Sequence, residues 1–315
     1  MRLSLIIPCF NEEEVLPDFF RETEEVRSEL FTRFAVQLEY IFVDDGSKDG
    51  TLACLRRLSA EHDYVRYISF ARNFGKEAAI AAGLQAAEGD YVGLIDADLQ
   101  DPPALMAEMM EMILAGKCDA AAAYRKDRRG ESRLRSWCAN RFYRLLSSAG
   151  EKMPQGARDY RIMTKQVRDA LMQMQEYNRF SRAMFQWVGF RTEWIGYENR
   201  TRAAGRTKWS LSGLMRYAVD ALTGYSSSPL RIASWFGIGM FFLSVVGIIF
   251  VIVRKLLFGD PTSGWPSLVC IILFCSGIQL FCIGIIGEYL ARTYMEVKDR
   301  PLYIIRETDR TQKKE

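Results

Sequence analysis

The sequence YVGLIDADLQDPP, residues 91–103, joins a short apolar run to a cluster of polar side chains. The run at residues 91–95 has the length and composition of a buried β-strand. It is followed at once by Asp96, Asp98 and Gln100, and two prolines then end the segment. Because open α/β sheets bind ligands at the carboxyl ends of their strands, the stretch predicts such a sheet with carboxylates at its binding edge.

The same three side chains offer hard oxygen ligands. A Mg²⁺ or Mn²⁺ ion that bridges a diphosphate keeps several waters and takes only one or two protein carboxylates. We therefore expect Mg²⁺ or Mn²⁺ at Asp96, Asp98 and Gln100. A solvated turn that ends at a proline is the alternative for an Asp-x-Asp sequence taken alone.

Strand and helix patterns alternate over the first 122 residues. Asn11, followed by three glutamates, is expected to cap the first helix. Strand–helix–strand repeats of this length predict a mostly parallel sheet with helices on both faces. Residues 125–210 are expected to form insertions that cover the binding edge. The expected strands are residues 3–7, 38–43, 65–70, 91–95 and 119–124.

Three of these strands end in polar clusters, at residues 8–12, 44–47 and 96–98. Side chains at the carboxyl ends of adjacent parallel strands line one crevice. The first strand is not followed by G-x-G-x-x-G, and the sequence contains no Walker A motif, which counts against a dinucleotide oxidoreductase and a P-loop enzyme.

Composition excludes several other classes. The net charge of +3 implies no nucleic-acid partner. The seven cysteines include no C-x-x-C pair, which favours reduced thiols over a disulfide scaffold or a zinc site. The single histidine, His62, lies in a polar connector and is expected at the surface rather than as a catalytic base.

Two apolar segments near the C-terminus, residues 232–253 and 267–287, contain no charged residue. At about 1.5 Å per residue, each can cross a hydrocarbon core of roughly 30 Å, which predicts two transmembrane helices. Basic residues gather after the second segment, so the positive-inside rule places both termini in the cytoplasm. Residues 211–229 are expected to form an amphipathic juxtamembrane helix, with an ordinary core helix as the alternative.

The expected organisation therefore has four parts: a cytosolic α/β domain, the juxtamembrane helix, a transmembrane hairpin and a cytosolic basic tail. Their boundaries are residues 1–210, 211–229, 230–291 and 292–315.

Eight short motifs follow one another along nearly the whole chain. They are PCFNEE (8–13), VDDGSKDGT (43–51), ARNFGKEA (71–78), DADLQDPP (96–103), DYRIM (159–163), RAAGRTK (202–208), GEYLAR (287–292) and RPLY (300–303). In this order, and joined to the apolar hairpin, they resemble the family-2 glycosyltransferases of the polyprenyl-phosphate class. This is the group of bactoprenol glucosyltransferases and dolichol-phosphate mannosyltransferases.

The resemblance implies a GT-A (Rossmann-like) domain at residues 1–210 and a metal-dependent, inverting hexose transfer. The donor is a nucleotide-sugar, with UDP-glucose as the first expectation. The acceptor is undecaprenyl or another polyprenyl phosphate at the cytoplasmic face of the plasma membrane, and the product serves cell-envelope glycan modification. The donor-binding residues that it implies are Pro8, Asn11, Glu12, Asp44, Asp45, Lys76, Asp96, Arg202 and Lys208.

Catalytic roles fall on Asp159, Asp98 and Arg125 by the same resemblance. An acceptor phosphate monoester has its second pKa near 6, so the nucleophile is already anionic and needs no strong base. We therefore expect Asp159 to orient the site, through Arg125 or Arg161. Arg158 stands before Asp159 where the family pattern often has Thr-Gly, a departure that bears on sugar specificity.

Three arginines, Arg133, Arg135 and Arg161, are expected to face the lipid phosphate and anionic headgroups, at about 1 kcal/mol for each charge near the surface. A solvated basic face is the alternative for Arg133 and Arg135. An ordinary basic loop is the alternative for Arg202 and Lys208.

Three other functions compete with lipid-phosphate glycosylation. A processive polysaccharide synthase normally has more spans and a Q-x-x-R-W motif, which this sequence lacks. A soluble-acceptor glycosyltransferase would leave the hairpin unexplained. A non-catalytic membrane scaffold that binds nucleotide-sugars would be favoured by a missing carboxylate, but both aspartates of the motif are present. A dimer or tetramer that packs through the spans is compatible with the sequence.

Overall fold

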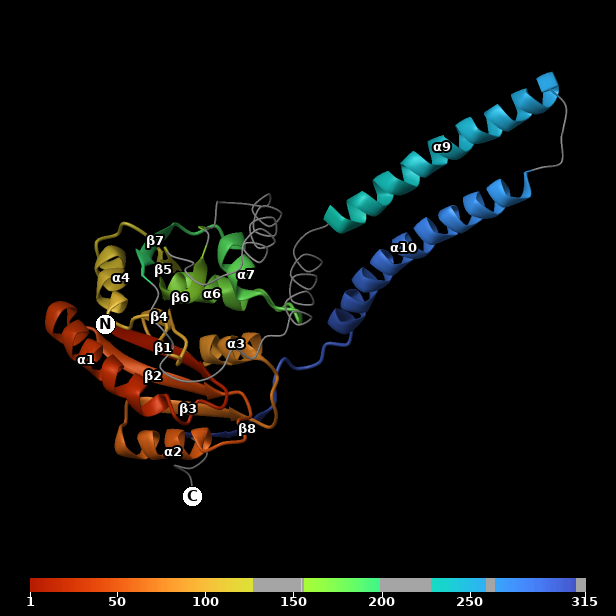
Figure 1. Ribbon diagram of the computed structural model, residues 1–315. Coiled ribbons are helices and arrows are strands. Elements are labelled where there is room, and N and C mark those ends of the chain that lie inside the picture. The colour runs from red at the N-terminus through yellow and green to blue at the C-terminus, as the bar shows by residue number, and fades with distance from the viewer. Residues whose placement is uncertain (127–153, 155, 199–227, 259–263, 310–315) are drawn as a thin grey trace. The chain divides into compact units, whose positions relative to one another are not determined.

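The computed structural model describes residues 1–126, 154, 156–198, 228–258 and 264–309. The chain divides into two compact units, Met1–Trp209 with Arg300–Glu315, and Ser210–Asp299. The first unit contains a sheet with its helices, and the second contains two long helices (Figure 1). The chain therefore returns to the first unit after the two helices.

The described part of the first unit has one mixed sheet, in the order β7-β5-β6-β4-β1-β2-β3-β8. Strand β1 pairs in parallel with β2 and β4, β2 with β3, and β5 with β7. Strand β6 is antiparallel to both of its neighbours, and β8 is antiparallel to β3. The expected α/β sheet is confirmed. The strands are Arg2–Cys9 (β1), Gln37–Asp44 (β2), Val65–Phe70 (β3), Tyr91–Leu94 (β4), Ala120–Arg125 (β5), Ala157–Thr164 (β6), Thr192–Tyr197 (β7) and Ile305–Thr308 (β8).

Helices cover both faces of this sheet (Figure 1). Helices α1, α2 and α4 share one buried apolar cluster with Leu5 and Ile7 of β1. Helix α3 packs on the opposite face, where Gly83 comes so close to Ile6 that a Cβ would lie 2.2 Å from its Cγ2. The helices of this unit are Leu16–Phe34 (α1), Thr51–Glu61 (α2), Lys76–Ala86 (α3), Leu105–Leu114 (α4), Lys165–Met172 (α6) and Ser181–Trp187 (α7).

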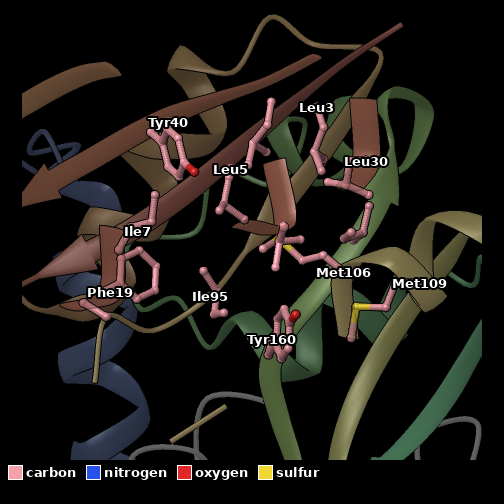
Figure 2. Packing of buried hydrophobic residues seen from close by; sticks show 14 of the residues in the cluster. Leu3, Leu5, Ile7, Phe19, Leu30, Tyr40, Ile95, Met106, Met109 and Tyr160 are labelled. Carbon is pink, nitrogen blue, oxygen red and sulfur yellow. The ribbon is translucent and has the colours of Figure 1, made fainter. Parts of the chain in front are cut away.

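The core fixes β1 at the centre of the sheet. Leu3, Leu5 and Ile7 of β1 pack with Phe19 of α1 and Met106 of α4, and all five are fully buried (Figure 2). Burial of each such side chain contributes about 1.5–3 kcal/mol. The chain order reverses between β1 and β4, and such a switch point is where open α/β sheets form their ligand crevice.

The start of the first helix differs from the expectation. Helix α1 begins at Leu16 after Val15, and Asn11 is not its cap. Asn11 has φ +55°, and its Oδ1 accepts a hydrogen bond from the amide of Lys48. Asparagine tolerates this left-handed backbone better than most residues. Its side chain therefore joins two loops instead of satisfying the helix end.

The segment expected to be only insertions also supplies part of the sheet. Strand β6 lies between β4 and β5, and β7 forms one edge. Tyr160, Ile162 and Met163 of β6 are fully buried. An antiparallel strand needs no helical crossover beside it, so the strand–helix alternation used for residues 1–122 does not reveal it.

The C-terminal segment, residues 292–315, is likewise more than a basic tail. Helix α10 (Trp265–Val297) includes the first part of it, and Ile305–Thr308 then forms β8 at the edge of the sheet. Four residues with one partner strand give too weak a local pattern to be predicted as a strand.

The second unit contains α9 (Ser228–Phe258) and α10. Large apolar side chains of α10 are exposed, among them Phe274 at 60% and Leu280 at 70%. Within the described residues, Phe274–Val297 is long and apolar enough to cross a bilayer. The span at residues 232–253 falls on α9 and stays a prediction, as does the full two-span topology. The juxtamembrane helix falls almost wholly outside the described residues.

Replacing Gly46 by alanine is expected to destabilise the protein by about 2–4 kcal/mol. Gly46 has φ +67°, and a Cβ there would lie 2.4 Å from the carbonyl carbon of Arg72. Gly116→Ala is the matched control, because Gly116 has φ +69° but a Cβ added to it would meet no atom within 4 Å. Gly116→Ala should lower the free energy of unfolding by about 1–2 kcal/mol, the cost of a left-handed backbone at a residue with a Cβ. Equal shifts of the unfolding midpoint in the two variants would show that the approach to Arg72 imposes no constraint.

Candidate functional site

Two buried carboxylates at the end of β2 shape the neighbouring loops. Asp44 accepts a hydrogen bond from the amide of Ser47 at 3.0 Å. Asp45 accepts from the amides of Phe74 and Gly75 at 2.6 and 2.9 Å. Burial raises the pKa of Asp45, although the two amide donors act against it. These carboxylates therefore position the loops that follow β2 and β3.

The loop after β1 is joined to the loop after β2. Asn11 accepts from the amide of Lys48, and the amide of Glu12 donates to Thr51 Oγ1, each at 2.9 Å. Pro8 lies half-buried near the end of β1. The structure thus brings the residues expected to hold a nucleobase and ribose to the same edge of the sheet.

Lys76 connects the first carboxylate of the D-x-D motif to Asp159. Its Nζ lies 2.6 and 2.8 Å from the two carboxylate oxygens of Asp96. The same Nζ lies 2.7 Å from Oδ2 of Asp159. Lys76 is the first residue of α3, Asp96 follows β4, and Asp159 lies on β6. Three elements therefore meet at one ammonium group.

A second cation, Arg182 of α7, also holds Asp159. Its Nε lies 2.8 Å from Oδ1 and its Nη2 3.3 Å from Oδ2. Ser181, the preceding residue, donates its hydroxyl and its amide to Glu77 of α3. Arg182 was not among the residues singled out from the sequence, because it stands outside every motif used there.

These contacts determine the charge state of Asp159. Burial alone would raise the pKa of Asp159, but Arg182 and Lys76 outweigh it and hold that pKa well below the usual range. Burial alone would lower the pKa of Lys76, but Asp159 and Asp96 outweigh it, so the pKa is raised. Both groups are therefore ionised at neutral pH.

Gln100 and Arg125 belong to a separate network around Asp101. Arg125 donates from Nη2 to Gln100 Oε1 at 2.8 Å and lies 3.4 Å from Asp101 Oδ1. The hydroxyl of Tyr197 donates to buried Asp101, and Arg158 Nε lies 3.9 Å from the same carboxylate. The expected metal ligand Gln100 therefore has its amide oxygen turned toward Arg125.

Among the described residues, the Asp159 carboxylate pairs with Lys76 and Arg182 and not with the expected Arg125. Arg161 interacts with Asp159 through its charge, and its hydrogen bonds go to the backbone carbonyl oxygens of Asp159 and Arg158.

Arg161 is 3% exposed, and its guanidinium carbon lies 3.5 Å from the ring centroid of Phe185. Its position in a central strand therefore differs from the expected membrane-facing one.

Two carboxylates, Asp96 and Asp98, remain as candidate metal ligands. In the part of the chain that the structure describes, no three His, Cys, Asp or Glu side chains gather as a ready metal site. Both side chains are half-buried after β4, and Oδ1 of Asp98 accepts the amide of Gln100 at 3.1 Å. Two carboxylates suit an ion that takes its other ligands from a diphosphate and water.

Four of the expected basic residues lie outside the described residues. They are Arg133, Arg135, Arg202 and Lys208.

Comparison with protein families accounts for both units. The glycosyl transferase family 2 model matches residues 4–177, more than half of the chain. This chain belongs to glycosyltransferase family 2. A second model, the GtrB C-terminal hairpin, matches residues 228–293 and so includes most of α9 and α10. The mixed sheet is accordingly of the GT-A type that this family uses.

Individual relatives of this glycosyltransferase match it over nearly their full length. It is 38% identical over 314 residues to the SfII prophage-derived bactoprenol glucosyl transferase of Shigella flexneri, which covers 98% of this chain and 99% of that protein. It is also 38% identical over 309 residues to the uncharacterized glycosyltransferase YkcC of Bacillus subtilis, with 98% and 94% covered. Among solved structures, mannosyl-3-phosphoglycerate synthase from Rubrobacter xylanophilus is similar over a smaller part, with 19% identity, a TM-score of 0.48, and 70% and 72% of the two chains covered.

The site of this glycosyltransferase combines carboxylates that can bind a metal ion with the ammonium group of Lys76. Asp96 and Asp98 can hold a cation. Lys76 lies between Asp96 and the buried carboxylate of Asp159. Asp159 is ionised, but its two cationic partners make it a weak base. A base with a strongly lowered pKa extracts protons poorly. This arrangement therefore suits a carboxylate that orients charge more than one that removes a proton.

Proposed function

We propose that this glycosyltransferase transfers glucose, with inversion, from UDP-glucose to a polyprenyl phosphate at the cytoplasmic face of the plasma membrane. The observation that carries the proposal is the Lys76 bridge between Asp96 and Asp159, in a chain that also has an exposed apolar helix. The bactoprenol glucosyl transferase of Shigella flexneri, 38% identical, supports the acceptor class and the sugar.

The donor diphosphate is proposed to lie beside the D-x-D motif. A divalent cation held by Asp96 and Asp98 would supply charge stabilisation for the leaving diphosphate. Because Lys76 already contacts Asp96 at 2.6 Å, its ammonium is close enough to a diphosphate at this edge to share in neutralising it. Arg202 and Lys208 are proposed as additional phosphate ligands.

Asp159 is proposed to position the acceptor side of the site. The acceptor phosphate carries its own negative charge near neutral pH, so it can attack the sugar without a protein base. Lys76 and Arg182 keep the Asp159 carboxylate ionised and restrict the orientation of its side chain. Asp159 can in this way hold the cationic groups of Lys76 and Arg182 in position to contact the phosphate groups of the donor and the acceptor.

The membrane arrangement is also part of the proposal. The catalytic domain of residues 1–210 and both termini are placed in the cytoplasm, with residues 211–229 on the membrane surface and two spans within residues 230–291. Basic residues after the second span support this orientation, and the exposed apolar side chains of α10 support a membrane-spanning helix. Arg133 and Arg135 are proposed to contact anionic lipid, and the spans to support a dimer or tetramer.

Transfer from radiolabelled UDP- and GDP-sugars to undecaprenyl phosphate in detergent tests the reaction. We expect a lipid-linked hexose from UDP-glucose with Mg²⁺, and no product with EDTA. A lipid product from another donor would correct the sugar. Nucleotide binding without a lipid product from any donor would contradict the acceptor and favour a scaffold role.

A further inference from the structure

The motif RPLY at residues 300–303 has no part in the proposed chemistry, yet the structure places it and β8 in the catalytic unit. Residues 303–308, here called the return segment, follow the helical hairpin in sequence. Strand β8 pairs Ile68 with Thr308 and Ser69 with Glu307. The amide of Ala71 then donates to the carbonyl oxygen of Ile304 at 2.9 Å, so the pairing continues past the end of β3.

Side chains fix the return segment against two elements. Arg56 of α2 donates from Nε and Nη2 to the two oxygens of Glu307 at 2.8 and 2.6 Å. Tyr67 of β3 donates its hydroxyl to the same carboxylate at 3.1 Å. Two parallel bonds from a guanidinium give both strength and a defined orientation. One carboxylate of β8 therefore joins this strand to both α2 and β3.

Tyr303 extends this contact toward the functional edge of the sheet. Its ring stacks on Phe70 with centroids 4.9 Å apart and planes at 12°. Its hydroxyl donates to Gln85 Oε1 of α3 at 2.5 Å. Phe70 in turn meets Phe74 edge-on, with centroids 5.8 Å apart and planes at 90°. Aromatic pairs in these two geometries attract beyond the effect of burial alone.

Phe74 stands in the loop that carries Lys76. The amides of Phe74 and Gly75 donate to Asp45, and the next residue, Lys76, reaches Asp96 and Asp159. A continuous series of contacts thus runs from Tyr303 through Phe70 and Phe74 to the donor-site loop, residues 71–76.

We infer that Tyr303 is a positioning residue for nucleotide-sugar binding, which acts by holding Phe70, Phe74 and the donor-site loop in place. The order of the donor-site loop therefore depends on residues 303–308, which follow the helical hairpin in the sequence. The consequence for donor binding rests on the proposed function, whereas the ordering of the loop does not.

Hydrogen exchange of full-length protein in detergent tests the ordering of the loop. In Tyr303→Ala, amide exchange in a peptide spanning residues 71–77 is expected to rise about tenfold, because the stacked pair that restrains the loop is lost. Exchange in β4 should stay unchanged. Tyr303→Phe keeps the ring and should remain within about twofold of the wild type. Phe31→Ala is the matched control, since Phe31 is 59% exposed on α1.

Titration with UDP, run on the same samples, tests the functional consequence. The dissociation constant for UDP should rise about tenfold in Tyr303→Ala and stay unchanged in Tyr303→Phe. The KM for polyprenyl phosphate should not move. If Tyr303→Ala fails to fold, Glu307→Gln provides the test instead. This variant keeps the shape of the side chain but weakens the Arg56 contact, and it should raise both the amide exchange of the loop and the dissociation constant for UDP.

The outcomes separate the two proposals. Unchanged exchange in the donor-site loop of folded Tyr303→Ala would overturn the positioning role. Raised exchange with unaltered UDP affinity would also overturn it, because the role would then be structural only. Raised exchange in a protein whose wild type binds no UDP would support the ordering of the loop and contradict the proposed donor.

Discussion

Replacing Asp98 by alanine is expected to lower kcat/KM for sugar transfer by about 10³-fold. Asp98 is one of the two D-x-D carboxylates after β4, and a divalent ion held by these two would lose one of its two protein ligands in this variant. Several kcal/mol of charge stabilisation on the leaving diphosphate would be lost with the ion. Transfer to undecaprenyl phosphate at saturating Mg²⁺, with unfolding midpoints measured in parallel, provides the test.

Asp169→Ala is the matched control for Asp98→Ala. Asp169 is a half-exposed carboxylate of α6 whose contact is with the adjacent Arg168, and its loss should leave transfer unchanged. EDTA should abolish wild-type transfer, and added Mg²⁺ should restore it. If Asp98→Ala stays within tenfold of the wild type and EDTA has no effect, the proposed metal is wrong.

Asp159→Asn is expected to reduce turnover by about 10–10²-fold without abolishing it, less than the 10⁴-fold that loss of a general base can cost. The residual rate should not rise steeply above pH 7, since the acceptor phosphate is already ionised there. Initial rates from pH 6 to 9 in wild type and variant test this. Complete loss of turnover with donor and acceptor still bound would contradict the orienting role.

The same variant should also lose stability, by about 1.5–3 kcal/mol, because the hydrogen bonds that Lys76 and Arg182 donate to the buried carboxylate lose their charged acceptor. The pKa of Asp159 is lowered in the folded protein. Its stabilising contribution is therefore present above the unfolded pKa, about 3.9, and is lost as pH falls through the folded pKa. The stability difference between wild type and Asp159→Asn should accordingly narrow only below about pH 4. A difference that already narrows near pH 6 would contradict the lowered pKa.

The strand-end motifs illustrate how much of the site is local information. Asp44, Asp45, Asp96 and Asp98 come at the ends of apolar runs, and continuous runs of this kind form strands that are buried on both faces of a parallel sheet. Parallel strands then bring their carboxyl ends to one edge. The location of these carboxylates could therefore be predicted without knowing any contact.

The partners of Asp159 could not be predicted in this way. Lys76 lies 83 residues from Asp159 and Arg182 lies 23 residues from it. Neither pair has a periodicity or a fixed spacing, and the choice of Arg182 over Arg125 or Arg161 depends on where α7 packs. Gln100 gives a similar case, since its oxygen meets Arg125 only because β5 lies beside β6.

The sequence by itself determined the α/β domain, the edge of the sheet that carries the carboxylates and the apolar C-terminal helices, because all three follow from local patterns of burial. Only the tertiary structure decided that β6 enters the sheet between β4 and β5, that Lys76 joins Asp96 to Asp159, and that the return segment supports the donor-site loop through Tyr303. These features are contacts between distant parts of the chain. Their energies depend on distance and burial in the folded protein, which no stretch of sequence contains.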